Sequence, residues 1–342
     1  MSQSARFGLL RGRHGTTIGV YLVLVAVIAV AAVLVGLTGR NLLTPGNMRV
    51  LMTSIAVLGI VAIGQTIVVM VGSLDLSVAY LVSLSSVLAA GVMAGQPGQT
   101  FAGIATALIA TTLIGAATGF LVGYLRLSGF IASLGVGLVV AGYLATNYRG
   151  TTGKATPALA EFGVAGIGPV PASTLLMLLC LVLAFVLMSR TRLGMHMLAV
   201  GGDPEVTRTS GIQPAFPILA AHAISGLCAG LAGLIIVARL GVGSPTAGAQ
   251  GGYDLLSIAA VVLGGTTLAG GRGTLWGTLG GILIFAVVDA AMGILEINPF
   301  FKDVVRGVVI VAAVALYARR VSGTSRRRFI GVGQLSAEGA TK

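Results

Sequence analysis

The sequence predicts an all-α membrane protein with about ten transmembrane helices, because three features exclude an ordinary soluble fold. Of its 342 residues, 56% are hydrophobic and only 9% are charged, whereas about a quarter of a typical soluble domain is charged. Apolar runs of about 20 residues, long enough to cross the hydrocarbon core, recur along the chain. Many of the 52 glycines lie inside these runs, where they let helix backbones approach closely.

These apolar runs and the turn residues between them divide the chain. The transmembrane domain covers residues 18–320, between an N-terminal tail of residues 1–17 and a basic C-terminal tail of residues 321–342. Broken or re-entrant segments are expected within it. The predicted spans are residues 18–37, 50–71, 78–95, 101–124, 129–147, 172–189, 216–238, 252–268, 274–293 and 303–319.

The distribution of Lys and Arg predicts the orientation of these spans. With the N-terminus in the cytoplasm, fourteen of the 21 basic residues fall on the cytoplasmic side and seven on the other side. An excess of Lys and Arg is expected in cytoplasmic loops. With this orientation and an even number of spans, both termini are cytoplasmic. The basic residues behind the net charge of +12 are scattered over span ends and the two tails. We therefore interpret them as a signal of membrane topology and expect no nucleic-acid partner.

Two short polar segments interrupt the continuous helices. Residues 71–78 and residues 264–273 are rich in glycine and hydroxyl side chains but too short for a soluble loop. Backbone that leaves a helix inside the bilayer must be buried in protein or line a wet cavity, because unpaired N–H and C=O groups are costly in lipid. Both breaks are therefore candidate parts of a substrate pathway, with tight cytoplasmic turns as the alternative. The candidate pathway residues are Ser73, Asp75, Ser77, Asp254, Thr266 and Thr267.

Three carboxylates, Asp75, Asp254 and Asp289, lie in or beside apolar runs. A carboxylate there is costly unless it faces a cavity or a partner, so each one is a functional candidate. Asp75 and Asp254 also precede apolar helices, where a side-chain oxygen can cap the first free N–H groups. The pathway and capping interpretations both stay open.

A weak internal repeat links the two breaks. Asp-Leu-Ser begins at residue 75 and Asp-Leu-Leu-Ser at residue 254, and each is followed by three glycines spaced four residues apart. Such small-residue faces are typical of close helix packing, and duplicated halves are common in transporters. The two series are Gly115, Gly119 and Gly123, and Gly273, Gly277 and Gly281.

The chain carries no recognisable enzyme site in its sequence. The nine acidic residues are dispersed, and the three histidines have no partner at the spacing of metal ligands. Residues 264–273 lack the Gly-Lys-Ser/Thr of a phosphate-binding loop, so this chain is not expected to bind ATP by that route. No catalytic residue, metal or cofactor is expected, and Cys180 and Cys228 are interpreted as buried structural thiols.

The longest predicted cytoplasmic loop, residues 189–214, has the signals of a short surface helix. The Asp-Pro-Glu sequence at residues 203–205 is a helix start, with a capping side chain followed by Pro at the first helical position. Gly211 suits a helix end. The helix predicted over residues 204–210 is a candidate docking element for a soluble partner, with a plain connector as the alternative.

Five segments of the chain carry a family resemblance. They read Gly-Ser-Leu-Asp-Leu-Ser-Val at 72–78, Ser-Gly-Phe-Ile-Ala-Ser-Leu-Gly at 128–135, Ala-Val-Gly-Gly-Asp-Pro at 199–204, Ser-Gly-Ile at 210–212, and Tyr-Asp-Leu-Leu-Ser-Ile-Ala-Ala-Val-Val-Leu-Gly-Gly-Thr-Thr-Leu-Ala-Gly-Gly-Arg-Gly-Thr at 253–274. In this order they resemble the permease family of carbohydrate ABC importers, the ribose, xylose and arabinose type. The chain departs from the family pattern at Met195, Asp203 and Asp254, where Arg, Asn and Glu are usual.

The resemblance implies a permease subunit that forms the translocation pathway for a sugar or sugar-like solute in the inner membrane of a bacterial cell. It implies three protein partners: a second permease subunit, identical or different; an extracytoplasmic solute-binding protein; and a cytoplasmic ABC ATPase that hydrolyses ATP, so that this chain is no enzyme. A coupling loop at about residues 190–214 would then rest on the ATPase. The implied coupling residues are Gly201, Gly202, Asp203, Pro204, Glu205, Arg208 and Gly211.

Other classes of membrane protein stay open at this stage. A branched-chain amino-acid or nucleoside ABC permease would share the architecture. An ion-coupled secondary transporter would need no ATPase and would use Asp75 or Asp289 as its coupling carboxylate. Uptake that depends on protons or sodium and survives the loss of ATP would favour it. A purely structural membrane protein is less compatible with the polar breaks.

Overall fold

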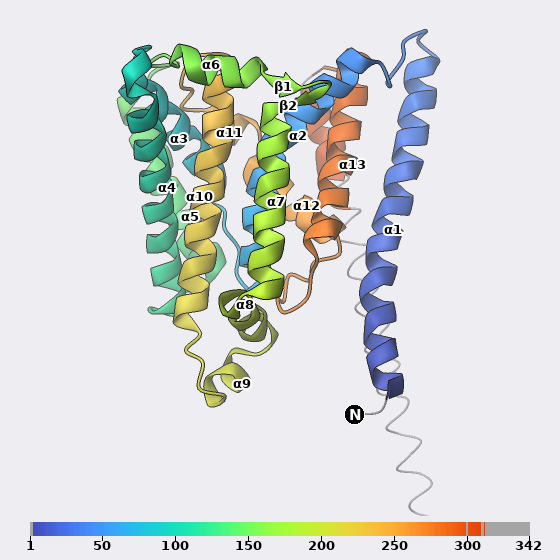
Figure 1. Ribbon diagram of the computed structural model, residues 1–342, viewed down its shortest axis with the longest axis vertical. Coiled ribbons are helices and arrows are strands. Elements are labelled where there is room, and N and C mark those ends of the chain that lie inside the picture. Colours follow the sequence, from blue (N-terminus) through green and yellow to red (C-terminus); the bar gives the residue numbers. More distant parts are fainter. Residues whose placement is uncertain (1–2, 299, 309–310, 312–342) are drawn as a thin grey trace, which may run out of the picture. The chain divides into compact units, whose positions relative to one another are not determined.

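The computed structural model describes residues 3–298, 300–308 and 311 (Figure 1). The chain divides into two units, Met1–Ile297 and Asn298–Lys342. In the second unit residues 300–308 and 311 are helical, and the Asn298 side chain accepts a hydrogen bond from the Phe300 N–H at 2.9 Å. The rest of the predicted span 303–319, and all of the predicted C-terminal tail, lie outside the described residues.

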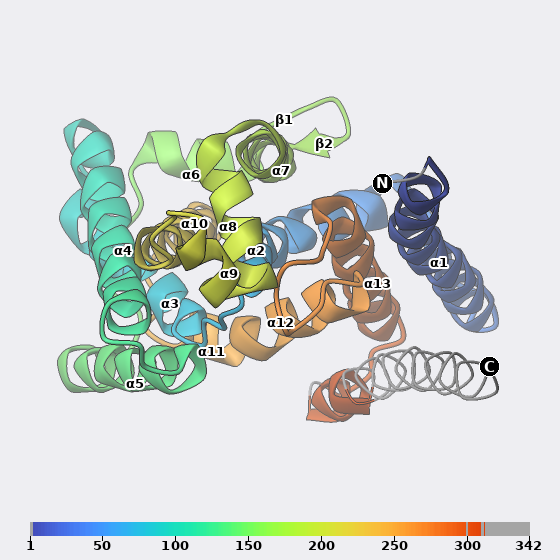
Figure 2. The same ribbon diagram turned by 90° about the horizontal axis from the view of Figure 1, so that it is seen from below.

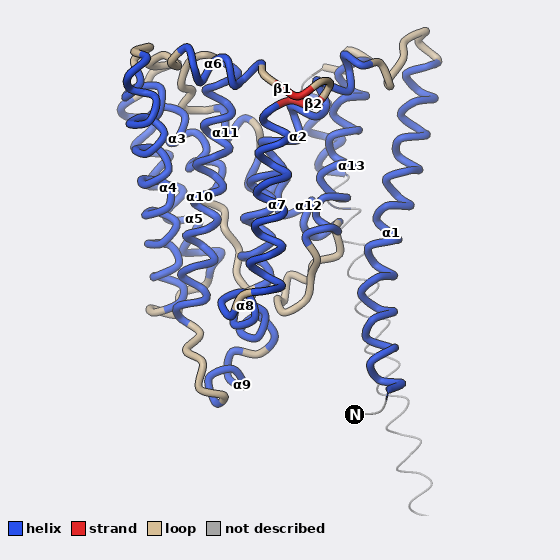
Figure 3. The backbone as a smooth tube through the Cα atoms, viewed as in Figure 1, coloured by secondary structure: helices blue, strands red, loops and turns tan. Residues whose placement is uncertain are grey.

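The first unit consists almost entirely of helices, as its backbone trace shows (Figure 3). The long helices are α1 (Gln3–Gly36), α2 (Pro45–Met70), α4 (Thr100–Gly123), α5 (Gly129–Asn147), α7 (Ala172–Arg190), α10 (Ala215–Leu240) and α13 (Leu275–Ile294). The short helices are α3 (Val78–Met93), η1 (Pro97–Gln99), α6 (Pro157–Val164), α8 (Arg192–Gly202), α9 (Pro204–Thr209), α11 (Ala247–Gln250) and α12 (Tyr253–Leu263). Strands β1 (Gly166–Ile167) and β2 (Val170–Pro171) pair in a small antiparallel ribbon.

Seven helices among the described residues are long and apolar enough to cross a membrane. Their outer faces carry large exposed apolar side chains, such as Leu22, Phe101 and Val139, which are 66%, 82% and 74% exposed. A surface of this kind suits lipid and not water. The chain is an all-α, multi-pass membrane protein, as the composition predicts.

Two of the predicted spans are shorter than a full crossing. Helix α3 has 16 residues and α12 has 11, whereas a helix that rises 1.5 Å per residue needs about 20 residues to span the hydrocarbon. The chain leaves the helical conformation before α3 at residues 71–77 and after α12 at residues 264–274. The two breaks predicted from the sequence are the reason that these helices are short.

Helices α2 and α10 form the centre of the first unit (Figure 2). Every residue of α2 from Ile55 to Met70 is buried, because α2 packs against α7, α10, α12 and α13. Helix α4 lies along α10, and α1 packs on the outside against α13. Both central helices carry fully or almost fully buried polar side chains, Gln65 and Thr66 on α2 and His222 and Ser225 on α10.

The two ends of this unit are different (Figure 1). At one end lie α6 and the β1–β2 ribbon. At the other lie α8 and α9, and α1 begins there. This second end is called the α9 end below.

Two segments that were predicted to be non-helical are helical in the structure. Helix α1 begins at Gln3, so most of the predicted N-terminal tail continues the first span. Residues 192–202 were predicted as part of a loop but form α8, which begins where the Thr191 hydroxyl accepts a hydrogen bond from the Gly194 N–H at 3.2 Å. The sequence did not predict α8 as a helix because α8 contains glycines, and glycine lowers helix propensity. The predicted short helix that follows is confirmed as α9.

The first glycine series is a helix-packing face, and Gly277 and Gly281 of the second lie on α13, whereas Gly273 belongs to the second break. On α4, a Cβ atom on Gly115 would overlap the carbonyl oxygen of His222, and one on Gly119 would lie 2.6 Å from the Leu219 Cα atom of α10. On α13, a Cβ atom on Gly281 would overlap the backbone of α12. The backbones of each pair therefore meet where a larger side chain would not fit.

We predict that Gly115→Ala lowers the free energy of unfolding by about 1–3 kcal/mol, because the added methyl group overpacks the α4–α10 interface. Chemical unfolding in detergent micelles measures this difference. Gly142→Ala on α5 is the matched control, since nothing lies within 4 Å of a Cβ atom at that position. Equal stabilities of the two variants would contradict the packing role of Gly115.

Candidate functional site

The first break begins where α2 ends in a left-handed glycine. Gly72 has φ +87°, and the N–H groups of Gly72 and Ser73 donate to the carbonyl oxygens of Val69 and Val68, both at 3.0 Å. This is the hydrogen-bond pattern of a Schellman cap, which satisfies the last carbonyl groups of a helix. The cap ends α2 inside the bundle, and the chain then runs without helix to Ser77.

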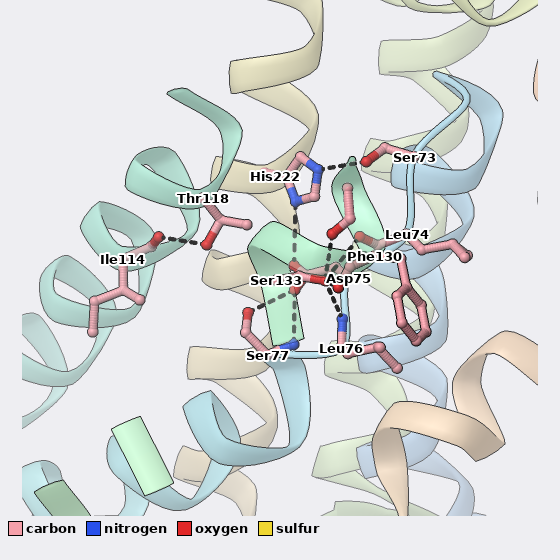
Figure 4. Close-up of polar contacts among 11 residues, drawn as sticks. Ser73, Leu74, Asp75, Leu76, Ser77, Ile114, Thr118, Phe130, Ser133 and His222 are labelled. Carbon is pink, nitrogen blue, oxygen red and sulfur yellow. Dashed lines mark hydrogen bonds and ion pairs between the residues drawn. The ribbon is translucent and has the colours of Figure 1, made fainter. Parts of the chain in front are cut away.

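Side chains from two helices satisfy the free backbone of this segment, and Figure 4 shows one of them, Ser133 of α5. In the amide orientation that satisfies both of its groups, Gln65 of α2 donates to the Asp75 carbonyl oxygen at 3.1 Å and accepts from the Asp75 N–H at 3.2 Å. The Ser133 hydroxyl of α5 accepts from the Leu76 N–H at 3.0 Å. Gln65 and Ser133 are both 0% exposed, so these bonds replace those that water cannot supply in a bilayer.

The carboxylate of Asp75 lies at the centre of a buried polar cluster (Figure 4). One oxygen, Oδ1, accepts from the Ser77 backbone N–H at 3.0 Å and from the Ser77 hydroxyl at 2.6 Å. The other, Oδ2, is 3.6 Å from Nδ1 of His222 on α10. Nε2 of His222 is in turn 2.9 Å from the Ser73 hydroxyl. Asp75, Ser77 and His222 are 0% exposed. Oδ1 is therefore paired by hydrogen bonds at this depth, whereas Oδ2 has only the 3.6 Å contact with His222.

The order of Ser73, His222 and Asp75 is that of a hydrolase triad, but the surroundings exclude that chemistry. A nucleophilic serine needs space for a substrate carbonyl group beside its hydroxyl. Ser73 is only 7% exposed, and Gly129 of α5 lies so close that a Cβ atom there would overlap the Ser73 hydroxyl. The cluster therefore holds the break in place and has no room to bind an acyl substrate.

The second break is a tight turn attached to the end of α2. The Thr267 N–H donates to the Arg272 carbonyl oxygen at 3.0 Å, and its hydroxyl donates to the Gly270 carbonyl oxygen at 2.9 Å. The Gly271 N–H donates to the Met70 carbonyl oxygen at 2.9 Å. The turn is therefore closed on itself by Thr267 and is held to α2 by a backbone hydrogen bond.

The end of α8 contacts both breaks through glycines. A Cβ atom on Gly201 would overlap the Met70 carbonyl oxygen and would lie 2.7 Å from the Gly271 nitrogen. A Cβ atom on Gly270 would lie 2.8 Å from the Gly72 Cα atom. Three separate parts of the chain thus meet backbone to backbone, with no flexible side chain between them.

Helix α9 extends from this contact at the α9 end. Asp203, the one residue between α8 and α9, caps α9 by accepting from the Glu205 and Val206 N–H groups at 2.9 and 3.1 Å. Glu205 and Arg208 are exposed on α9, and Gly211 has φ +84°, as a helix end requires. The segment is a rigid, polar projection from the bundle.

Comparison with known proteins decides the family. The sequence model of the family described as "Branched-chain amino acid transport system / permease component" matches residues 47–314. The chain belongs to this family of permeases. No solved structure matches it significantly.

Three named relatives of this permease are sugar permeases. The ribose import permease protein RbsC of Escherichia coli (strain K12) is 36% identical over 296 residues, 85% of this chain and 91% of the relative. The D-allose transport system permease protein AlsC of the same strain is 30% identical over 312 residues, 91% and 93% of the two chains. The L-arabinose transport system permease protein AraH is 32% identical over 276 residues, 80% and 83%. These matches confirm the resemblance to the ribose and arabinose branch and favour it over the alternatives.

The structure brings together some of the candidate pathway residues of the permease and separates others. Ser73, Asp75 and Ser77 belong to one cluster. Thr266 and Thr267 follow the end of α12, whereas Asp254 is in its first turn, about 16 Å away along an 11-residue helix. The six residues are therefore parts of at least two different sites in this conformation.

Neither carboxylate is the N-cap of its helix. Gly252, with φ +61°, is the N-cap of α12, so Asp254 is the second residue of the helix and not its cap. Asp75 accepts from the N–H of Ser77, which is itself the N-cap residue of α3. The Asp75 carboxylate thus satisfies a backbone group beside the helix and not one of the first amides within it.

Three residues of the cluster were missed in the sequence: Gln65, Ser133 and His222. The spacing of metal ligands assigns no role to His222, because that criterion does not take depth in the membrane into account. Gln65 and His222 lie well inside the predicted spans 50–71 and 216–238, where any strongly polar side chain indicates a partner within the bundle. That signal could have identified both of them, although not the segment that they contact.

We predict that Gln65→Met destabilises the permease, since it leaves two buried backbone groups of Asp75 without a partner. Each such group costs roughly 1–3 kcal/mol in the free energy of unfolding. Unfolding in detergent, compared with the wild type, measures the loss. Gln96→Met, at an exposed position, is the control and is expected to be neutral; a neutral Gln65→Met would show that the amide does not support the break.

Proposed function

We propose that this permease is the membrane-spanning subunit of an ATP-driven importer and forms the translocation pathway for a sugar or sugar-like solute. The observation that carries the proposal is the match to permeases for ribose, D-allose and L-arabinose along 83–93% of their lengths. Similarity of this extent includes both breaks and the α8–α9 segment. It supports the same type of transport and leaves the individual solute to experiment.

The importer requires partners that this chain does not contain. We propose a cytoplasmic ABC ATPase that hydrolyses ATP, an extracytoplasmic binding protein that delivers the solute, and a second permease subunit. The pathway then lies between the two permease subunits. Because the binding protein selects the solute, the permease itself needs no deep, tight sugar site.

The α9 end is proposed to face the cytoplasm of a bacterial cell, with the chain in the inner membrane and both termini cytoplasmic. The excess of basic residues on the predicted cytoplasmic loops supports this orientation. The start of α1 and the α8–α9 segment are at the same end of the unit, as the predicted topology requires (Figure 1).

Helix α9 is the proposed contact with the ATPase. Its support is physical: α9 is exposed, is fixed by its Asp203 cap, and is joined through α8 to both breaks. Gly201 and Gly202 form the end of α8, while Pro204 and Gly211 bound the projecting segment. Closure of the ATPase would push α9, and α8 would transmit that movement into the bundle.

The six pathway candidates are also part of the proposal. Ser73, Asp75, Ser77 and Thr266 are buried within one subunit, so their proposed role is to hold the two breaks beside the pathway. Thr267 closes the second break. Asp254 lies in the first turn of the half-length helix α12, and its proposed role is to line the pathway there.

Copurification from the native membrane in mild detergent tests the importer. We expect an ATPase subunit to copurify, with ATP hydrolysis that vanadate inhibits, and uptake of radiolabelled D-ribose, D-allose or L-arabinose to require ATP. A preparation without ATPase that exchanges solute under a proton or sodium gradient would instead establish a secondary transporter.

We predict that the double variant Glu205→Ala with Arg208→Ala weakens ATPase binding about tenfold, close to 1.4 kcal/mol, because it removes both charged side chains of α9. Quantitative copurification of the ATPase measures the effect, and membrane insertion is expected to be unchanged. The control is Glu161→Ala with Arg239→Ala, which removes the same two exposed residue types elsewhere on the surface. Equal recovery of ATPase from both variants would argue against docking on α9.

A further inference from the structure

A groove separates α9 from the neighbouring end of α4. It encloses about 440 Å³ and is lined by the end of α4 and the link that follows it, by α9, and by the start of α10. Three charged side chains line it: Arg126 of the link, and Glu205 and Arg208 of α9. Two guanidinium groups against one carboxylate make the groove positive and suited to an acidic group.

The walls of this groove are rigid. On one side, Gly123 lies so close to α10 that a Cβ atom would come within 2.6 Å of the Ala215 carbonyl oxygen. On the other, Asp203 caps α9. A preformed groove loses little conformational freedom when a partner binds, and this favours affinity.

Arg126 has an unusual backbone for its residue type. Its φ is +57°, a left-handed conformation that costs free energy for any residue with a Cβ atom and that glycine adopts freely. The position lies in the link after α4, and glycine would serve it better for stability alone. A strained residue with a long charged side chain, exposed beside α9, indicates that the guanidinium group is needed there.

We propose that this groove is a second docking surface for the ATPase and that Arg126 and Arg208 together bind a carboxylate side chain of that partner. The inference rests on the proposed function and extends its contact from α9 to the link of residues 124–127. Val206 on α9 and Leu125 on the link, 60% and 55% exposed, are apolar side chains available to a partner on the same two elements.

The competing occupant of the groove is the phosphate headgroup of an anionic lipid. Tyr124 and Leu127 of the link are exposed, as residues at a membrane surface often are. The ATPase is favoured because one wall is α9, which extends farther from the bundle than the end of α4 does (Figure 1). A headgroup would be bound near the helix ends and not along this projection.

The test is the affinity of the wild-type chain and of Arg126→Gly for the ATPase subunit that copurifies with the wild type. Binding is measured in nanodiscs of phosphatidylcholine alone and in nanodiscs that also contain phosphatidylglycerol. We expect Arg126→Gly to raise Kd about tenfold, or 1.4 kcal/mol, in both lipids. The unfolding midpoint is expected to be equal or higher, because glycine relieves the strained backbone.

Matched controls isolate the guanidinium group. Ala94→Gly makes the same type of change at another left-handed residue, with φ +44°, and Arg149→Gly removes an exposed arginine beyond the far end of α5. Both are expected to bind the ATPase as the wild type does. Arg126→Asn is a second variant, since Asn tolerates the left-handed conformation, and is expected to match Arg126→Gly.

Wild-type affinity of Arg126→Gly and Arg126→Asn would overturn the second docking surface while the proposed importer stands. A loss confined to nanodiscs with phosphatidylglycerol would also overturn it, because Arg126 would then act through lipid. If no ATPase copurifies with the wild-type chain, the importer proposal itself is contradicted. That result differs from normal ATPase binding by the Arg126 variants, which contradicts only the second docking surface.

Discussion

The hydrogen bonds that satisfy the backbone between α2 and α3 are the constraint on which the rest of the bundle depends. Water cannot reach these N–H and C=O groups, so each needs a partner from the protein. Gln65 supplies one pair of bonds from α2, and Ser133 supplies another from α5. His222 adds a contact with the Asp75 carboxylate from α10. A seven-residue break thereby determines how three helices approach one another.

Glycine is what allows this arrangement to close. Gly115 and Gly119 bring α4 against α10 at the level of His222, and Gly281 brings α13 against α12. Gly201 brings the end of α8 against both breaks. Close-packed backbone cannot absorb a displacement as a flexible side chain can, so a movement of α8 is transferred directly to the segments beside it. The contact of Gly201 with the end of α2 and with the second break gives the proposed coupling a physical route.

Much of this could be predicted from local sequence. The predicted span 129–147 coincides with α5, and α9 begins at the predicted Pro204, because apolar runs and caps act over a few residues. Helix α8 was missed because its glycines oppose helix formation locally, and packing on the two breaks overrides that preference. The lengths of α3 and α12 were overestimated because hydropathy does not distinguish a full crossing from a half-length helix followed by apolar loop.

The sequence by itself determined the membrane class, the permease family, the positions of both breaks and the cap of α9, since composition and short motifs are sufficient for each. The tertiary structure alone decided which residues surround Asp75 and which helix each glycine face contacts. Ser73 and His222 are 149 residues apart in the chain, and several helices of similar apolar composition could have supplied the partner. Only the packing of these helices selects one of them, because close contact is possible only where glycine faces and polar groups match at the same depth.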